Sequence, residues 1–237
     1  MVEQLVLLLK ACRPRQSLKN LSLFTGLIFS GWLFIPVKFW TTVAAFIIFS
    51  LLTGSVYIFN DIIDLESDKK HPFKKKRPLA SGRLSLPLAL FASLSGFLIS
   101  LFLGWGLSFF LFLGMIGYLL LQFIYTFWLK KQPIIDVIAI AFGFIIRVYA
   151  GAAVIGAHLN VWLLLCIISF ALFLAIGKRR SELTLLQGKN ASRQVLGRYP
   201  EKLLDVYTAM FANTTWLTYA LFTFMFPAFV FTGRALT

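Results

Sequence analysis

The chain has 237 residues, of which 59% are hydrophobic and 14% are charged, and its formal net charge is +14. A soluble domain carries about a quarter of charged residues, so this composition excludes an ordinary soluble protein. Several segments reach about 20 apolar residues, the length that crosses a bilayer as a helix. We therefore expect residues 1–237 to form a single integral-membrane domain, an all-α, polytopic transmembrane helical bundle.

Seven transmembrane segments are predicted along the chain, separated by short turns and by two long polar stretches. The polar stretches, Asp61–Arg83 and Lys178–Asp205, follow the second and the sixth segment. Long polar stretches at one end of a helical bundle are a common place for binding and catalytic residues. The predicted segments are Asn20–Pro36, Phe39–Phe59, Leu84–Trp105, Gly106–Leu129, Ile134–Gly156, Val161–Gly177 and Val206–Gly233.

The basic residues predict the orientation of these segments. With the N-terminus inside, 20 of the 23 Lys and Arg lie on the inner side, and only Lys38, Arg147 and Arg234 do not. This bias satisfies the positive-inside rule, so we expect the plasma (inner) membrane, with the N-terminus and both polar stretches cytoplasmic. The net charge then needs no nucleic-acid partner, although a basic face attracts anionic lipids and substrates.

The first polar stretch concentrates charge of both signs in NDIIDLESDKKHPFKKKRPLASG, residues 60–82. Asn60, Asp61, Asp64 and Asp68 recur at helical spacing, so that three of them share one face. Carboxylates this close repel one another unless a cation lies between them. Mg²⁺ takes oxygen ligands and shares itself with substrate phosphates. We predict that these four residues hold Mg²⁺ and that the three aspartates are catalytic.

The basic half of the same stretch is predicted to bind the phosphate oxygens that a metal leaves free, through Lys70, Lys74 and Arg77. The alternative is a solvated loop whose basic residues serve only membrane topology. This alternative explains the acidic half less well, because acidic residues are rare elsewhere in the chain.

The pattern N-D-x-x-D-x-x-x-D, followed by H-P and K-x-R-P-x-A-x-G, resembles the first aspartate-rich motif of the UbiA-type intramembrane prenyltransferase superfamily. Four further segments resemble its decaprenyl-phosphate phosphoribosyltransferase branch. The resemblance implies Mg²⁺ and transfer of phosphoribosyl from phosphoribosyl pyrophosphate to a polyprenyl phosphate. The superfamily typically has nine transmembrane helices, so we expect a C-terminal truncation or the absence of the final helices. The four segments are RPRQSLKN (13–20), YTFWLKKQPIIDV (125–137), GFIIRVYAGA (143–152) and GKRRSEL (177–183).

The second polar stretch bears on the choice of substrate. Ordinary members of the superfamily carry a second D-x-x-x-D motif there, whereas this chain has GKRRSEL with one carboxylate, Glu182. More bases and fewer acids favour two anionic substrates. One rival is a prenyltransferase that moves a prenyl group from a prenyl diphosphate to an aromatic or quinone precursor. The other is a non-enzymatic transporter or scaffold, although a transporter would show polar or broken helices in several segments.

Arg147 lies mid-segment, where a bare charge costs about 3 kcal/mol or more. Asp136 precedes it by about three helical turns and shares its face. Arg147 is either a substrate ligand or one member of a structural ion pair. Lys178 and Glu182, four residues apart on a helix, are either residues of the site or an ordinary ion pair on the surface. Charged residues near the inner face serve either substrate binding or membrane topology. Tyr125 is either a substrate ligand or an anchor at the membrane interface. A homo-oligomer is compatible with the sequence. The other predicted substrate-binding residues are Arg13, Gln16, Lys19, Tyr125, Lys130 and Arg179.

Overall fold

The computed structural model describes residues 2–129, 132–186 and 200–225. Within these ranges the chain is helical and has no strand, which confirms the all-α prediction. The elements are α1 (Val2–Ala11), η1 (a 3₁₀ helix, Pro14–Phe24), α2 (Thr25–Phe29), α3 (Pro36–Ile63), α4 (Leu65–Lys70), η2 (Lys74–Lys76), α5 (Leu86–Leu107), α6 (Phe109–Phe127), α7 (Ile135–Ile155), α8 (Val161–Leu186) and α9 (Glu201–Met225).

Five described helices are long and apolar enough to cross a membrane: α3, α5, α6, α7 and α8. They correspond to the second through sixth predicted segments. The first predicted segment, Asn20–Pro36, instead continues η1 into the short α2. Serine, asparagine and glycine recur along it, and all three are weaker helix formers than alanine or leucine. In the seventh segment, α9 begins earlier than predicted and carries several threonines, which lower its hydropathy; residues 226–233 of that prediction lie outside the described ranges.

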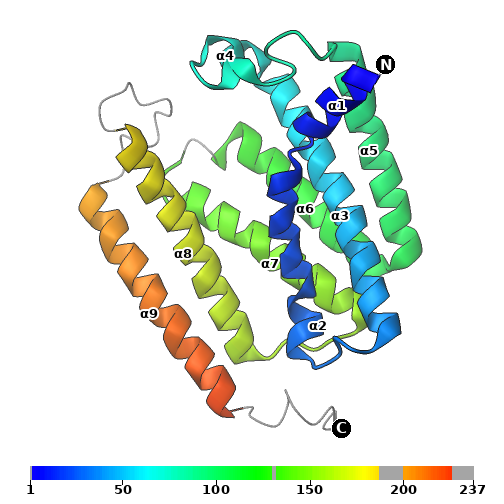
Figure 1. Cartoon of the computed structure of the whole chain (residues 1–237). Coiled ribbons are helices and arrows are strands. Elements are labelled where there is room, and N and C mark those ends of the chain that lie inside the picture. Colours follow the sequence, from blue (N-terminus) through cyan, green and yellow to red (C-terminus); the bar gives the residue numbers. More distant parts are fainter. Residues whose placement is uncertain (1, 130–131, 187–199, 226–237) are drawn as a thin grey trace.

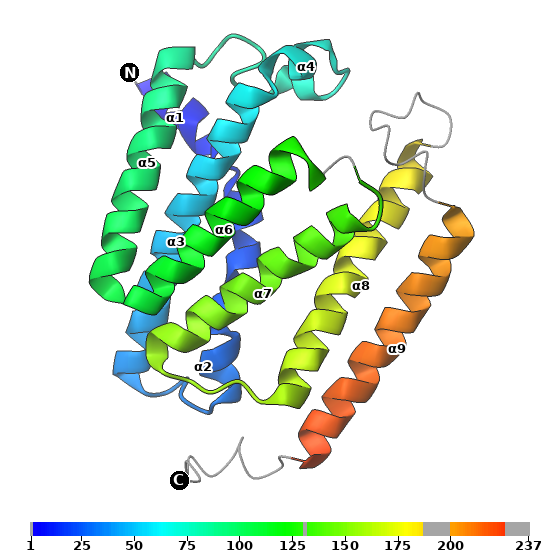
Figure 2. The same cartoon turned by 180° about the vertical axis from the view of Figure 1, so that it is seen from behind.

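The helices form one bundle in which the chain reverses direction at successive turns (Figure 1). α1 and α4 lie at one end of the bundle and α2 at the other, and the opposite view shows the same arrangement (Figure 2). We call the first of these the α4 end. The order of reversals agrees with the alternation that the basic residues predicted, and it brings the ends of α3, α6 and α8 and the start of α7 together near the α4 end.

The largest buried cluster surrounds the middle of α3, where Phe49 and Leu52 pack with Met115 of α6 and Leu23 of η1. Small residues let η1 approach α7 closely. A Cβ atom added at Gly151 would lie 2.1 Å from the carbonyl oxygen of Leu23. This contact fixes the height of η1 against α7, and therefore the height of the polar side chains that η1 carries.

Replacing Gly151 with alanine is expected to lower the melting temperature of the purified protein in detergent by several degrees. The added methyl group meets backbone rather than a flexible side chain, so η1 or α7 must shift. Gly117→Ala is the matched control, because a Cβ atom there meets nothing within 4 Å and alanine favours a helix. Equal melting temperatures for the two variants would contradict the packing of η1 on α7.

Candidate functional site

A cavity of about 560 Å³ lies near the α4 end and is lined by residues of η1, α3, α6, α7 and α8 and of the segment after α4. The cavity brings together many of the residues predicted from sequence. Those that line it are Arg13, Lys19, Asn60, Asp61, Asp64, Lys74, Arg77, Tyr125, Arg147 and Lys178.

The acidic motif lies where α3 ends and α4 begins. The single helix face predicted for it is interrupted, because α3 ends at Ile63 and Asp64 caps both helices. Asp61 and Asp68 are buried and nevertheless lie close together, since Arg77 donates a hydrogen bond to each of them.

Further cations complete this cluster. Arg13 pairs with Asp61, and the Nζ atom of Lys74 lies 3.7 Å from Oδ1 of Asp68. In this geometry Lys74 and Arg77, predicted to bind phosphate, neutralise the acidic motif instead. This cluster, hereafter the acidic end of the site, therefore carries nearly balanced charge; its Asp68 lies behind the residues that line the cavity.

The donors at the acidic end match the chemistry of Mg²⁺. They are carboxylate and amide oxygens, which Mg²⁺ prefers, and Oδ1 of the buried Asp68 has no hydrogen-bond partner. No three acidic, histidine or cysteine side chains converge as a ready metal cluster in the described part of the chain. The carboxylates of Asp61 and Asp68 are instead engaged in ion pairs with Arg77 and Lys74. Binding a metal there requires these cations to move.

Arg147 also lines the cavity and is only 5% exposed. Its guanidinium donates to Oδ1 of Asn20 at 2.7 Å, to the carbonyl oxygen of Gly143 at 2.6 Å and to the hydroxyl of Tyr118 at 3.0 Å. The ring of Tyr118 also lies against it, 4.5 Å from centroid to Cζ. All three acceptors are neutral. The structural ion pair that the sequence left open for Arg147 is therefore not found in the described ranges.

Lys19 and Lys178 line the same part of the cavity as Arg147. Lys19 immediately precedes the first predicted membrane segment. Burial, together with the charges of Lys178, Arg147 and Arg13, lowers the pKa of Lys19 to about 8. This region, hereafter the basic end, concentrates positive charge that the acidic motif does not neutralise.

Arg179 lies beside the cavity rather than in its lining. It is 1% exposed, and its guanidinium pairs with Asp136 at 2.6 Å and with Glu182 at 2.7 Å. It also donates to the hydroxyl of Tyr125 at 3.3 Å. α8 continues as a helix to Leu186, well past the predicted end of its apolar segment, and thereby carries Arg179 to α7. These contacts favour a supporting role for Arg179, which holds the cavity residue Tyr125.

Asp136 and Glu182, which pair with Arg179, do not line the cavity, and neither do Gln16 and Lys70. Gln16 and Lys70 are exposed at the surface, and Lys70 follows the exposed pair of Lys69 with Glu66. Lys130 lies outside the described residues.

Sequence reasoning missed several uncharged residues of the site. Asn20 is fully buried and donates to Ser50 and Thr53 while it accepts from Arg147. Tyr118 accepts from the same arginine, and Tyr57 lines the cavity near Arg13. A polar residue or a tyrosine within an apolar segment is the only signal of such positions, and membrane-interface anchors give the same signal.

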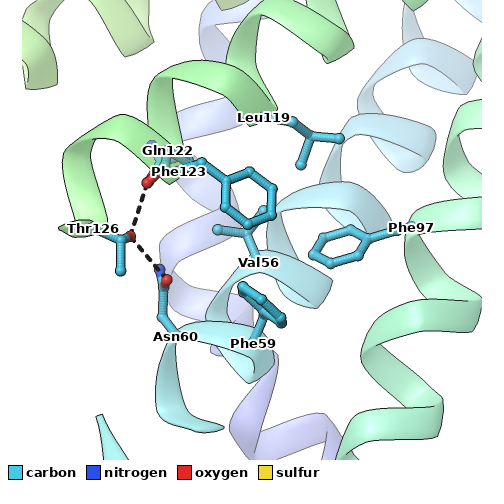
Figure 3. Close-up of a pocket in the computed structure, with 8 residues that line it drawn as sticks. All are labelled: Val56, Phe59, Asn60, Phe97, Leu119, Gln122, Phe123 and Thr126. Carbon is cyan, nitrogen blue, oxygen red and sulfur yellow. Dashed lines mark hydrogen bonds between the residues drawn. The ribbon is translucent and has the colours of Figure 1, made fainter. Parts of the chain in front are cut away.

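A small niche adjoins the cavity between α3, α5 and α6 (Figure 3). The rings of Phe59, Phe97 and Phe123 gather there, and Thr126 donates to the side-chain oxygen of Asn60 at 3.0 Å (Figure 3). Its free volume of about 10 Å³ is about that of one water position. The niche is therefore too small for a substrate, and the large cavity is the candidate site.

Together, the fold and the cavity define an integral membrane protein with a charged site at one end of a helical bundle. The UbiA prenyltransferase family model matches residues 21–236, and the chain belongs to this family.

Named relatives and solved structures agree with this assignment. The decaprenyl-phosphate phosphoribosyltransferase of Mycolicibacterium smegmatis is 34% identical over 215 residues, which cover 88% of this chain and 65% of that protein. The protein of the same name from Corynebacterium glutamicum is 33% identical over 92% of this chain and 67% of the relative. The chain thus spans about two thirds of the length of these relatives. A UbiA homolog from Archaeoglobus fulgidus, solved bound to DMAPP and Mg²⁺, has the same fold, with a TM-score of 0.78 at 19% identity over 94% of this chain and 83% of that one.

Proposed function

We propose that this chain carries the site for Mg²⁺-dependent transfer of 5-phosphoribosyl from phosphoribosyl pyrophosphate to a polyprenyl (decaprenyl) phosphate. The reaction takes place at the cytoplasmic face of the membrane, to which the basic residues assign the α4 end. The observation that carries the proposal is one cavity whose lining combines carboxylates of the acidic motif and their paired cations with three further cations, Lys19, Arg147 and Lys178. Such a cavity suits two anionic substrates, of which one is a diphosphate ester. The named relatives support the same choice of substrates.

The acidic end would receive the pyrophosphate. Asn60, Asp61, Asp64 and Asp68 would hold Mg²⁺, which neutralises the leaving pyrophosphate when it is bound. Arg13 and Arg77 would transfer their hydrogen bonds, and Lys74 its ion pair, from the carboxylates to the pyrophosphate oxygens. These three cations are the ones that neutralise the acidic motif in the structure.

The reaction breaks the bond between C1 of the ribose and the pyrophosphate oxygen and forms one between C1 and an oxygen of the acceptor phosphate. The acceptor phosphate is already ionised, so no general base is needed. Positive groups fixed around the departing charge stabilise the transition state. The apolar side chains of Leu121, Phe144 and Leu174, which line the cavity, limit the access of water to C1.

The test uses membranes that contain the protein and phosphoribosyl pyrophosphate labelled in the ribose. We expect label to enter the organic phase only when polyprenyl phosphate and Mg²⁺ are both present, and EDTA to abolish the transfer. Addition of Mg²⁺ in excess over EDTA should restore it. Transfer from a labelled prenyl diphosphate to an aromatic acid, with none from phosphoribosyl pyrophosphate, would instead assign the chain to the quinone-type reaction.

A further inference from the structure

We infer that Lys19, Arg147 and Lys178 form a second anion subsite, which binds a phosphate monoester separately from the acidic end. The inference rests on the proposed function and adds to it where the second phosphate lies. The chemistry recognised is a monoester dianion, supplied either by the acceptor lipid phosphate or by the 5-phosphate of the sugar.

The first support is the hydrogen bonding of Arg147. An arginine has five N–H donors, and the hydrogen bonds of this buried side chain go to Asn20, Gly143 and Tyr118, all neutral. In the described part of the chain no ion pair involves it. Its charge is thus held in place by neutral dipoles, with N–H groups left for a ligand in the cavity that it lines.

The second support is the hydroxyl of Tyr118. It accepts from Arg147, so its own proton is left to donate, and Tyr118 lines the cavity. Packing restrains the position of Tyr118, because its ring centroid lies 5.2 Å from that of Phe49. Asn20 restrains the guanidinium of Arg147, to which the Tyr118 hydroxyl is bonded. A phosphate oxygen at this position would receive charge-assisted hydrogen bonds, which are stronger than neutral ones.

The third support is the concentration of charge around Lys19. The cations that face it are Arg13, Arg147 and Lys178, and together with burial they lower its pKa to about 8. Asp61 and Asp64 line the same cavity, and the carboxylate of Asp61 is already paired with Arg13 and Arg77. An anion bound among the cations would raise the pKa of Lys19, so binding of the monoester is coupled to protonation of this lysine.

The surroundings match a monoester that carries an apolar group. Leu18 of η1, Ile140 and Phe144 of α7 and Leu174 of α8 line the cavity with these cations. They give an isoprenoid tail an apolar path beside its phosphate, while the sugar 5-phosphate shares only the charged contacts.

The test measures equilibrium binding, without turnover, by purified protein in nanodiscs. The probes are a short prenyl phosphate, ribose 5-phosphate and Mg²⁺-phosphoribosyl pyrophosphate. Lys19→Gln is expected to weaken binding of the monoester about tenfold or more, the usual size of one lost charge-assisted bond. Lys202→Gln, an exposed lysine outside the cavity, is the matched control and should bind like the wild type.

The pH dependence provides a second readout. Wild-type affinity for the monoester should fall as pH rises from 7 to 9.5, because Lys19 loses its proton near pH 8, while the monoester is already a dianion above its second pKa of about 6. Lys19→Arg keeps its charge over this range, so its affinity should stay flat. A structural role for Lys19 would not produce this difference.

The outcomes separate this inference from the proposed function. Selective loss of prenyl phosphate binding in Lys19→Gln supports an acceptor subsite, and selective loss of ribose 5-phosphate binding supports a sugar-phosphate subsite. If wild type and Lys19→Gln bind both monoesters equally at every pH, the subsite is refuted, even where labelled transfer proceeds. A wild type that binds monoesters in this way but transfers no label overturns the proposed function and leaves the subsite standing.

Discussion

Membranes that contain Asp64→Asn are expected to transfer phosphoribosyl at less than about one hundredth of the wild-type rate, the usual cost of removing one group that stabilises transition-state charge. Asp64 lines the cavity at the junction of α3 and α4. The pairs of Arg13 and Arg77 go to Asp61 and Asp68 and stay intact. The variant thus removes one of the carboxylates proposed to hold Mg²⁺ while these pairs remain. The measurement is labelled transfer together with thermal unfolding.

Glu66→Gln is the matched control for this prediction. Glu66 lies two residues further along, is exposed, and pairs only with Lys69 among the ion pairs of the described chain. A change of less than about twofold in transfer is expected, because exposed pairs contribute little. Full activity of Asp64→Asn would mean that the acidic end is a structural cluster and that the metal site lies elsewhere.

Arg179→Met is expected to destabilise the protein by about 3 kcal/mol or more, the usual cost of breaking a buried ion pair from one side. The change leaves the buried carboxylate of Asp136 without its arginine and Glu182 without the same partner. It also removes the donor to Tyr125. Reversible unfolding in mixed detergent micelles measures the difference in free energy of unfolding.

The double variant Arg179→Met with Asp136→Leu distinguishes support from substrate binding. Replacing both members of the pair by apolar groups removes the buried Asp136 carboxylate together with Arg179 and should recover much of the lost stability. Transfer should recover in parallel if Arg179 acts only by holding Tyr125 and α7. Recovered stability with transfer still lost would show instead that Arg179 contacts substrate.

Much of the bundle could be predicted because the membrane imposes length and apolarity on each helix. α7, predicted as Ile134–Gly156, runs from Ile135 to Ile155. The helix α8 begins at Val161 as predicted, but its C-terminal end was not predictable in this way, because its polar residues after Gly177 remain helical under tertiary contacts such as Arg179 with Asp136. η1 and α2 escaped prediction since apolar composition does not distinguish a 3₁₀ segment from an α-helix.

The residues of the site were easier to predict than their partners. Helical spacing placed Asp136 on the face of Arg147, yet Asp136 pairs with Arg179 of the next helix. Two side-chain partners of Arg147 come from other elements, Tyr118 of α6 and Asn20, which lies 127 residues earlier in the chain. Spacing within one segment carries no information on such contacts, because they depend on how η1 packs against α7.

The shared arginine of the acidic motif has a consequence for the order in which ligands bind. Arg77 bridges Asp61 and Asp68, so a free divalent ion must compete with an internal cation for the same oxygens. If the metal binds together with pyrophosphate, the displaced guanidinium of Arg77 can pair with the pyrophosphate. The carboxylates would then pair with the metal, so no charge is left without a partner. We therefore expect metal and pyrophosphate to bind cooperatively, each raising the affinity for the other by the same factor. Either ligand alone would displace Arg77 from the two aspartates less readily than both together.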